Sequence, residues 1–152
     1  MGFDIHFRYA EGAEEKGDLA KFLLLQPFNY PGYEFWVKRC HDELVADYKR
    51  AIICLNNGHL VGDLIFQQHK TFSTWLELKN VRVDSRFQRR LVFSFMLRQA
   101  EYVAGKEGYL AMICDARSDR TDVLKILRTA GYSEIARVAL YESDVEDIVM
   151  GK

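Results

Sequence analysis

Apolar and polar residues alternate from Phe3 to Tyr9, and this period of two predicts a strand near the beginning of the chain. In the next two segments, 13–25 and 33–48, apolar residues recur at every third or fourth position, which predicts two amphipathic helices. Pro27 and Pro31 lie between these segments and separate them, because proline fixes φ and removes a backbone donor.

Two apolar runs between residues 51 and 66 flank the pair Asn57-Gly58, which is the sequence typical of a two-residue β-hairpin turn. A third run, Thr74–Val83, predicts another antiparallel strand. Together these three strands form a meander.

Helical spacing returns at Leu91 and ends at Gly105, and the apolar segment Tyr109–Cys114 predicts a strand that is covered on both faces. Ser118 or Asp119 is expected to cap a further helix.

Gly131 is expected to end that helix, and residues 132–142 predict a last strand. From Ser143 onward we expect a short helix or a frayed end. The order β-α-α-β-β-β-α-β-α-β is that of an α/β fold with mixed strand direction.

The composition predicts one globular domain over residues 1–152, with 49% hydrophobic and 13% aromatic residues. A net charge of −1 gives no field that would attract nucleic acid. No apolar run is long enough to span a bilayer, and the N-terminus lacks the pattern of a secretion signal. We therefore expect a cytoplasmic protein that binds neither nucleic acid nor membranes.

Cys40, Cys54 and Cys114 occur singly in apolar contexts, without the spacing of a metal site or a disulfide framework. We expect reduced core cysteines and no metal site.

Basic residues cluster once, at the end of the fourth expected strand and in the turn that follows it, and no glycine separates this turn from the next helix. A helix start beside arginines suits a small anionic partner. The alternative is an ordinary solvated turn. The cluster consists of Arg82, Arg86, Arg89 and Arg90.

The order of elements, with VRVDSRFQRR after the fourth strand and ILRTAGYSEI at the fourth helix, resembles the GNAT superfamily of acyl-CoA-dependent N-acetyltransferases over almost the whole chain. The resemblance implies a mixed, mostly antiparallel sheet flanked by helices, in which the fourth strand splays from the fifth. It also implies that acetyl-CoA or another acyl-CoA is the co-substrate. Its pantetheine arm would bond to the backbone of the fourth strand, and the next loop and helix start would hold its pyrophosphate.

The family's loop has Gln or Arg, two residues, Gly, one residue, and then Gly or Ala. This chain matches the pattern at Gln88, whereas Leu91 and Phe93 replace the two small residues. The donor-binding residues that the resemblance implies are Val81, Arg82, Val83, Gln88, Arg89, Arg90, Leu91, Val92 and Phe93.

Acyl transfer to an amine needs a base, because an amine with a pKa near 10.4 must lose a proton before it attacks. Glu77 is the candidate, since it lies on the fourth strand in the region where GNAT enzymes often place a base. The alternative is a strand carboxylate paired with Lys79 or with a neighbouring chain. His59 and His69 are further candidates.

Protonating the departing thiolate is less demanding, because a thiol pKa near 8.5 makes it a tolerable leaving group. Leu127 replaces the family's usual catalytic tyrosine, and Arg120 its usual asparagine. Tyr132, which follows glycine as the aromatic does in the family, is the candidate acid, with Tyr141 as a second. Each is alternatively a core or strand aromatic.

The segment QPFNYPGYEFW joins the first two helices and is rich in aromatics and poor in charge. In such folds this segment usually recognises the acceptor, so Phe28, Tyr30 and Tyr33 are candidate substrate-binding residues for an apolar amine or a longer acyl chain. The alternative is that aromatics such as Phe35 and Trp36 only pack the two helices together.

The expected function is transfer of an acetyl or other acyl group from acyl-CoA to a small-molecule or peptide amine, by direct attack in a ternary complex. One alternative is an N-acyltransferase that takes its acyl group from acyl carrier protein. Another is a GNAT-fold binding or regulatory protein without turnover. A strand edge near Tyr141 could pair with a second subunit, so a homodimer is one option.

Overall fold

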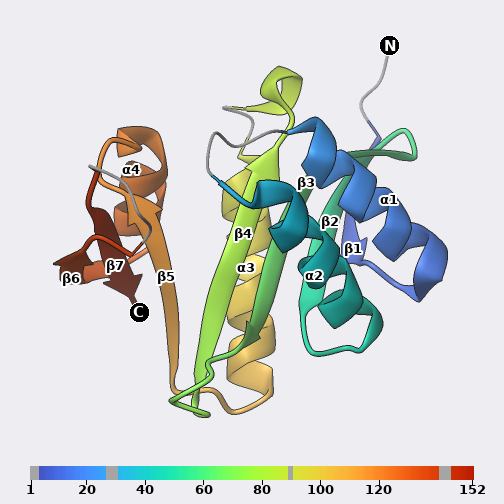
Figure 1. Ribbon diagram of the computed structural model, residues 1–152. Coiled ribbons are helices and arrows are strands. Elements are labelled where there is room, and N and C mark those ends of the chain that lie inside the picture. The colour runs from blue at the N-terminus through green and yellow to red at the C-terminus, as the bar shows by residue number, and fades with distance from the viewer. Residues whose placement is uncertain (1–3, 27–30, 89–90, 141–144) are drawn as a thin grey trace. The chain divides into compact units, whose positions relative to one another are not determined.

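The structure is a computed structural model that describes residues 4–26, 31–88, 91–140 and 145–152. Strands and helices follow one another in the expected order, with one additional strand at the end (Figure 1). The elements are β1 (Ile5–Tyr9), α1 (Gly12–Leu25), α2 (Tyr33–Val45), β2 (Arg50–Asn56), β3 (His59–Gln68), β4 (Trp75–Val83), the 3-10 turn η1 (Ser85–Phe87), α3 (Val92–Lys106), β5 (Ala111–Arg117), α4 (Thr121–Thr129), β6 (Ser133–Val138) and β7 (Asp147–Gly151).

The strands form a sheet in the order β1-β2-β3-β4-β5-β7-β6. β1 and β2, β2 and β3, β5 and β7, and β6 and β7 pair antiparallel, whereas β4 and β5 are parallel. This confirms the expected α/β class with a mixed, mostly antiparallel sheet flanked by helices.

The hairpin between β2 and β3 turns at the predicted pair. Asn57 has φ 51° and Gly58 has φ 81°, which are the two left-handed positions of a type I′ turn. The predicted hairpin is therefore confirmed.

β4 and β5 pair over three residues at the beginning of each strand, from Trp75 with Ala111 to Glu77 with Ile113. β4 then continues to Val83 and β5 to Arg117 without further pairing to each other. A ladder that stops this early is the pairing expected of splayed strands.

The chain divides into two compact units. Unit 1 consists of Met1–Gln67 and Lys79–Ala100, and unit 2 of Gln68–Leu78 and Glu101–Lys152. The expected single domain over residues 1–152 stays a prediction.

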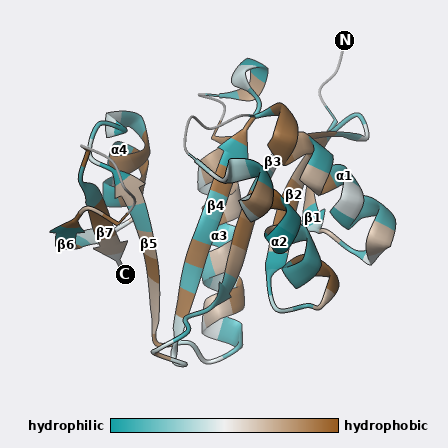
Figure 2. Ribbon diagram, viewed as in Figure 1, coloured by the Kyte–Doolittle hydropathy of each residue, from teal (hydrophilic) through white to brown (hydrophobic). Residues whose placement is uncertain are grey.

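In unit 1, α1 and α2 lie on one face of the strands and α3 lies behind them (Figure 1). The apolar sides of α1 and α2 bury Leu19 and Val37 against Ile53 and Ile65 of the strands, and brown segments of Figure 2 mark these apolar stretches. Burial of such side chains is the main stabilising term of the fold.

In unit 2, α4 buries Leu124 and Leu127, and β5 and β7 bury Met112 and Met150. β6 lies at the end of the strand order, and all six of its residues are exposed. The core of this unit is therefore made by α4, β5 and β7.

The prediction for the end of the chain was wrong. Instead of a short helix or a frayed end, β7 pairs with β5 on one side and with β6 on the other. Ile148 and Met150 are buried, and this burial stabilises a strand whose sequence alone gives only a short apolar run.

The predicted cap of α4 was also wrong. The N-cap residue is Arg120, and no side chain in the described part of the chain caps the helix. Asp119 instead accepts hydrogen bonds from Arg117, at 2.8 Å from Nη2 and 3.1 Å from Nε, so its carboxylate is engaged elsewhere.

The three cysteines are buried, as predicted for core residues. Burial raises the pKa of the Cys40 and Cys114 thiols to about 12 and that of Cys54 to about 11. Within the described ranges, no helix combines the length and the apolar character that a membrane crossing requires.

Candidate functional site

The connection from β4 to α3 is held by a carboxylate rather than by glycine. The Asp84 carboxylate accepts a hydrogen bond from the Arg86 amide at 2.9 Å and so caps η1. The Asp84 amide donates to the Val61 carbonyl at 2.8 Å, and the Phe87 ring is buried beneath the turn. The turn is thus anchored to β3 and to the core of unit 1.

Two of the predicted donor-binding side chains fold back onto the end of β4. Arg82 donates from Nη1 to the Val81 carbonyl at 2.6 Å, and Gln88 donates from Nε2 to the Val83 carbonyl at 3.2 Å. The backbone that the GNAT resemblance assigns to the pantetheine arm is therefore contacted by one polar side chain of β4 itself and by one from the next turn.

Leu91 occupies the position where the GNAT pattern has its first glycine, and its φ of 62° lies in the left-handed region. The Leu91 side chain is 64% exposed, so it does not turn into the core. The backbone conformation that glycine would favour is thus adopted without glycine, with the leucine side chain directed outward.

α3 begins directly after Leu91, whose carbonyl accepts the first intrahelical bond, from Phe95 N–H at 3.0 Å. The amides of Val92, Phe93 and Ser94 precede that bond, at the positive end of the helix dipole. Val92 is buried and Phe93 is half-buried. Such an arrangement can bind a phosphate or another small anion.

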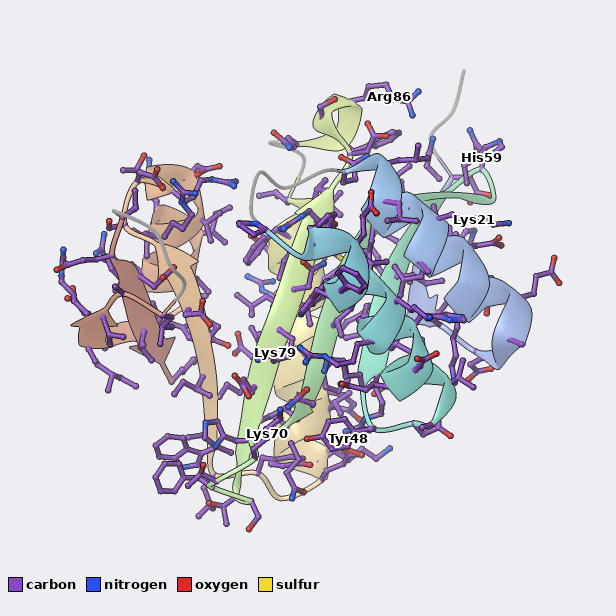
Figure 3. All side chains as sticks on the ribbon, in the orientation of Figure 1. Lys21, Tyr48, His59, Lys70, Lys79 and Arg86 are labelled. Carbon is purple, nitrogen blue, oxygen red and sulfur yellow. The ribbon has the colours of Figure 1, made fainter. Side chains whose placement is uncertain are left out.

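Arg86 is engaged within the turn itself. Its Nε and Nη2 atoms each lie 3.1 Å from an oxygen of Asp84, and these bonds lower the pKa of Asp84. Figure 3 shows Arg86 on the turn that follows β4. Arg89 and Arg90 lie outside the described residues, so their predicted role in binding an anion stays a prediction.

A buried polar pair on β3 and β4 escaped the sequence analysis. The Asp63 side chain is fully buried, and its Oδ2 accepts a hydrogen bond from Nδ2 of Asn80 at 2.8 Å. Burial raises the pKa of Asp63 to about 7, although the bond from Asn80 and the charge of Arg82 lower it. One acidic residue within the apolar run VGDLIF was the signal that could have revealed it.

The two predicted catalytic residues, Glu77 and Tyr132, lie in unit 2 but on opposite faces of its strands. The Tyr132 hydroxyl contacts the sulfur of Met112 at 3.6 Å, and Met112 pairs with Leu76. Glu77 is the next residue along β4, and successive side chains of a strand point to opposite faces. The two side chains are therefore not brought together.

Tyr132 is buried, and burial together with the nearby charge of Glu101 raises the pKa of its phenol. Leu127, where the family usually has tyrosine, is also buried. Glu77 is half-buried at the last paired position of β4 with β5.

Tyr33 lies in the core of unit 1, where its hydroxyl donates to the Leu23 carbonyl at 2.6 Å. Its ring stacks on Trp36 with 6.1 Å between the ring centroids, whereas the Phe35 side chain is 82% exposed. Phe28 and Tyr30 lie outside the described residues, so the acceptor-binding role of this segment stays a prediction.

The two histidines named as further bases lie at opposite ends of β3. His59 is exposed at the β2–β3 hairpin (Figure 3). The His69 ring accepts backbone hydrogen bonds at Nδ1 from Thr71, at 3.1 Å, and from Phe72, at 3.0 Å. That nitrogen of His69 is therefore used by the turn before β4.

Comparison with solved structures identifies the fold. A putative GNAT-family acetyltransferase from Desulfovibrio desulfuricans superimposes with a TM-score of 0.85 at 13% identity, and the match covers 98% of each chain. A GNAT-family acetyltransferase from Streptococcus pneumoniae superimposes with a TM-score of 0.75 at 16% identity, and the match covers 98% of this chain and 99% of that one. A putative acetyltransferase from Salmonella typhimurium, solved with acetyl-CoA, superimposes with a TM-score of 0.74 at 13% identity. This match covers 97% of this chain and 92% of that one.

No family model matches the sequence, and no curated protein matches it. At 13–16% identity, these three similarities establish the fold. The protein has the GNAT fold, as the resemblance implied.

Proposed function

We propose that the protein is an N-acyltransferase that moves an acetyl or other acyl group from acyl-CoA to a small-molecule or peptide amine. The observation that carries the proposal is the left-handed turn at Leu91, which opens the N-terminus of α3 directly after β4. In a GNAT fold this is the position of the donor pyrophosphate. Helix-terminal amides suit that group whatever the side chains are.

The reaction is direct attack in a ternary complex. The amine nitrogen forms a bond to the thioester carbonyl carbon, and the carbon–sulfur bond breaks with its electron pair leaving on sulfur. The amine proton passes to a base, directly or through water, and the thiolate takes up a proton. The products are an amide and free CoA.

Glu77 is the proposed base. Keeping a lysine-like amine in its free form at pH 7 costs about 4–5 kcal/mol at 1.36 kcal/mol per pKa unit, and a carboxylate at the reacting nitrogen reduces this cost. Its place at the last paired residue of β4 and β5 supports this role, because the strand is no longer bonded to β5 beyond it.

Tyr132 remains the candidate acid from the sequence, but its burial against Met112 favours water as the proton source for the thiolate. A thiol with a pKa near 8.5 needs little help to leave. We therefore expect that removing the Tyr132 hydroxyl affects folding more than turnover.

The test is binding followed by turnover. Thermal unfolding of the protein is measured with free CoA, acetyl-CoA and a long-chain acyl-CoA, because a ligand at 100 times its dissociation constant adds about 2.7 kcal/mol of stability. Thiol release is then measured across a panel of amines. Absence of a shift with all three ligands would overturn the proposal.

A protein that binds CoA without turnover is the second candidate, and the buried Leu127 at the family's tyrosine position favours it. A stabilising shift with CoA but no thiol release with any amine would support this candidate. Binding of a holo acyl carrier protein but not of free CoA would support a carrier-protein donor. A cytoplasmic location and a homodimer stay proposals.

A further inference from the structure

We infer that Asp63 is a positioning residue of the proposed acyl-transfer site, which through Asn80 holds the second half of β4, Lys79–Val83, in the form that binds the acyl donor. The inference rests on the proposed function. It concerns a residue on β3 that the GNAT motifs named above do not include.

The burial of Asp63 calls for a reason beyond stability. Its side chain has no exposed surface, and only Oδ2 has a hydrogen-bond partner among the described residues, whereas Oδ1 has none. A buried carboxyl with one unsatisfied oxygen is costly, and an apolar pair of similar shape would stabilise a strand at least as well. A hydrogen bond between Asp63 and Asn80 is directional, so it can fix the position of β4 on β3 more narrowly than an apolar contact would.

The contact reaches the part of β4 that the donor would use. Asn80 is buried on β4, beyond the last residue paired with β5, and it precedes Val81 and Val83 by one and three residues. A hydrogen bond from its amide to Asp63 ties this stretch to β3. Hydrogen bonds to an ionised acceptor are roughly twice as strong as those between neutral groups.

Among the residues that the structure describes, two titratable or charged side chains interact with Asp63. Arg82 on β4 acts on the carboxyl through its charge, and the Cys40 thiol on α2 lies near enough to interact with it. Ile53, its partner on β2, is apolar. Cys40 has its pKa raised to about 12 by burial, so it stays protonated across the neutral range.

Burial raises the pKa of Asp63 to about 7, so its charge changes within an accessible range of pH. Above this pKa the ionised carboxyl holds Asn80 more firmly than below it. Donor affinity should therefore increase as pH rises through about 7. Simple repulsion between ionised Asp63 and the donor diphosphate would give the opposite sign.

The experiment is equilibrium binding of free CoA by calorimetry at pH 6.0, 7.0 and 8.0, with the wild type, Asp63→Asn and the control Gln67→Met. Gln67 is a second buried polar residue of β3, and neither of its side-chain polar atoms has a partner among the described residues. Titration of the CoA phosphates changes the affinity of all three proteins equally. A difference in affinity between the proteins therefore comes from the protein side chains.

We expect Asp63→Asn to bind CoA about tenfold more weakly than the wild type at pH 8.0, which corresponds to about 1.4 kcal/mol, and equally at pH 6.0. Gln67→Met should follow the wild type at every pH. At pH 8.0 the donor KM should rise in Asp63→Asn while kcat changes little, because the residue acts through β4 and does not touch the reacting atoms.

Equal or tighter binding by Asp63→Asn at pH 8.0, beside a wild type that binds CoA, would overturn this inference and leave the proposed function standing. A wild type that binds no CoA at any pH would overturn both. If circular dichroism shows that Asp63→Asn does not fold, Asn80→Ala tests the same contact from β4. This variant should bind CoA about tenfold more weakly than the wild type at pH 8.0. Equal or tighter binding would overturn the inference.

Discussion

Two of the connections that lead from a strand into a helix, β4 to α3 and β5 to α4, differ in how the chain turns before the helix. From β4 to α3 the chain passes through η1 and a left-handed residue, Leu91, and Asp84 caps the turn. From β5 to α4 it passes through three residues, and Arg120 precedes the helix with φ −88° and no side-chain cap. Of these two connections, only the first has a left-handed residue directly before the helix.

Among the described residues, arginine pairing does not distinguish the two connections. Arg86 is bonded to Asp84 in the first and Arg117 to Asp119 in the second, each through two guanidinium nitrogens. In both, a carboxylate two residues away neutralises the arginine. The described arginines therefore do not mark the candidate anion site, whereas the left-handed residue before α3 distinguishes this connection from the one before α4.

The largest expected effect concerns Asp63 on β3, and it is a change in the free energy of unfolding with pH. A carboxyl with a native pKa of about 7 and an unfolded pKa near 3.9 binds more protons in the native state between these values. The free energy of unfolding should therefore fall as pH rises from about 4 to 7, by up to about 4 kcal/mol. In Asp63→Asn the free energy of unfolding should not decrease in this way with pH, whereas in Gln67→Met it should decrease as in the wild type. Urea unfolding at several pH values measures the free energy of unfolding. The same dependence on pH in the wild type and in both variants would refute the prediction.

The second effect concerns the strand before the first connection. Glu77→Gln should lower kcat by about 100-fold or more, because a general base contributes about 10²–10⁴. The affinity for CoA should not change. Steady-state rates and calorimetry measure the two quantities.

The matched control is Asp119→Asn, in the second connection, which should leave kcat close to that of the wild type. Turnover by Glu77→Gln at the wild-type rate would remove Glu77 from the proposed mechanism.

The third effect is smaller and tests the left-handed turn itself. Leu91→Gly should raise the free energy of unfolding by about 1 kcal/mol, because a leucine at φ 62° is strained and glycine is not. It should also tighten CoA binding by allowing a closer approach to the amides of α3. Chemical denaturation and calorimetry measure both changes.

Arg120→Gly provides the contrast, since the φ of Arg120 is negative and glycine only adds flexibility there. This variant should lose stability by about 0.5–1 kcal/mol. A loss of stability of the same size in Leu91→Gly would contradict the argument from its conformation.

The smallest effect is expected for the arginines. Arg86→Ala and Arg117→Ala should each change thermal unfolding hardly at all, because exposed ion pairs contribute little. CoA binding should also change by less than about twofold in both. A tenfold weaker binding in Arg86→Ala alone would show that this side chain leaves Asp84 to contact the ligand.

Local signals predicted much of this fold. Asn57-Gly58 specifies a type I′ turn because both positions need positive φ, and Gly131, with φ 97°, ends α4 as predicted. These positions could be predicted because the backbone conformation depends on the residues themselves.

What escaped prediction depends on contacts between distant residues. β7 is a strand because β5 and β6 lie on either side of it, and Asp119 does not cap α4 because Arg117 takes its oxygens. The donor site could be proposed from Gln88 only through the family resemblance. The Asp63 bond to Asn80 links residues 17 positions apart, which no local pattern reveals.

The place of β7 also has a consequence for the order in which unit 2 can assemble. Because β7 is the middle strand of three, β6 has no partner among the described strands until Asp147–Gly151 is synthesised. During synthesis α4 and β6 therefore emerge before their sheet can close. A chain that stops short of Asp147 should leave β6 as a loose, protease-sensitive segment.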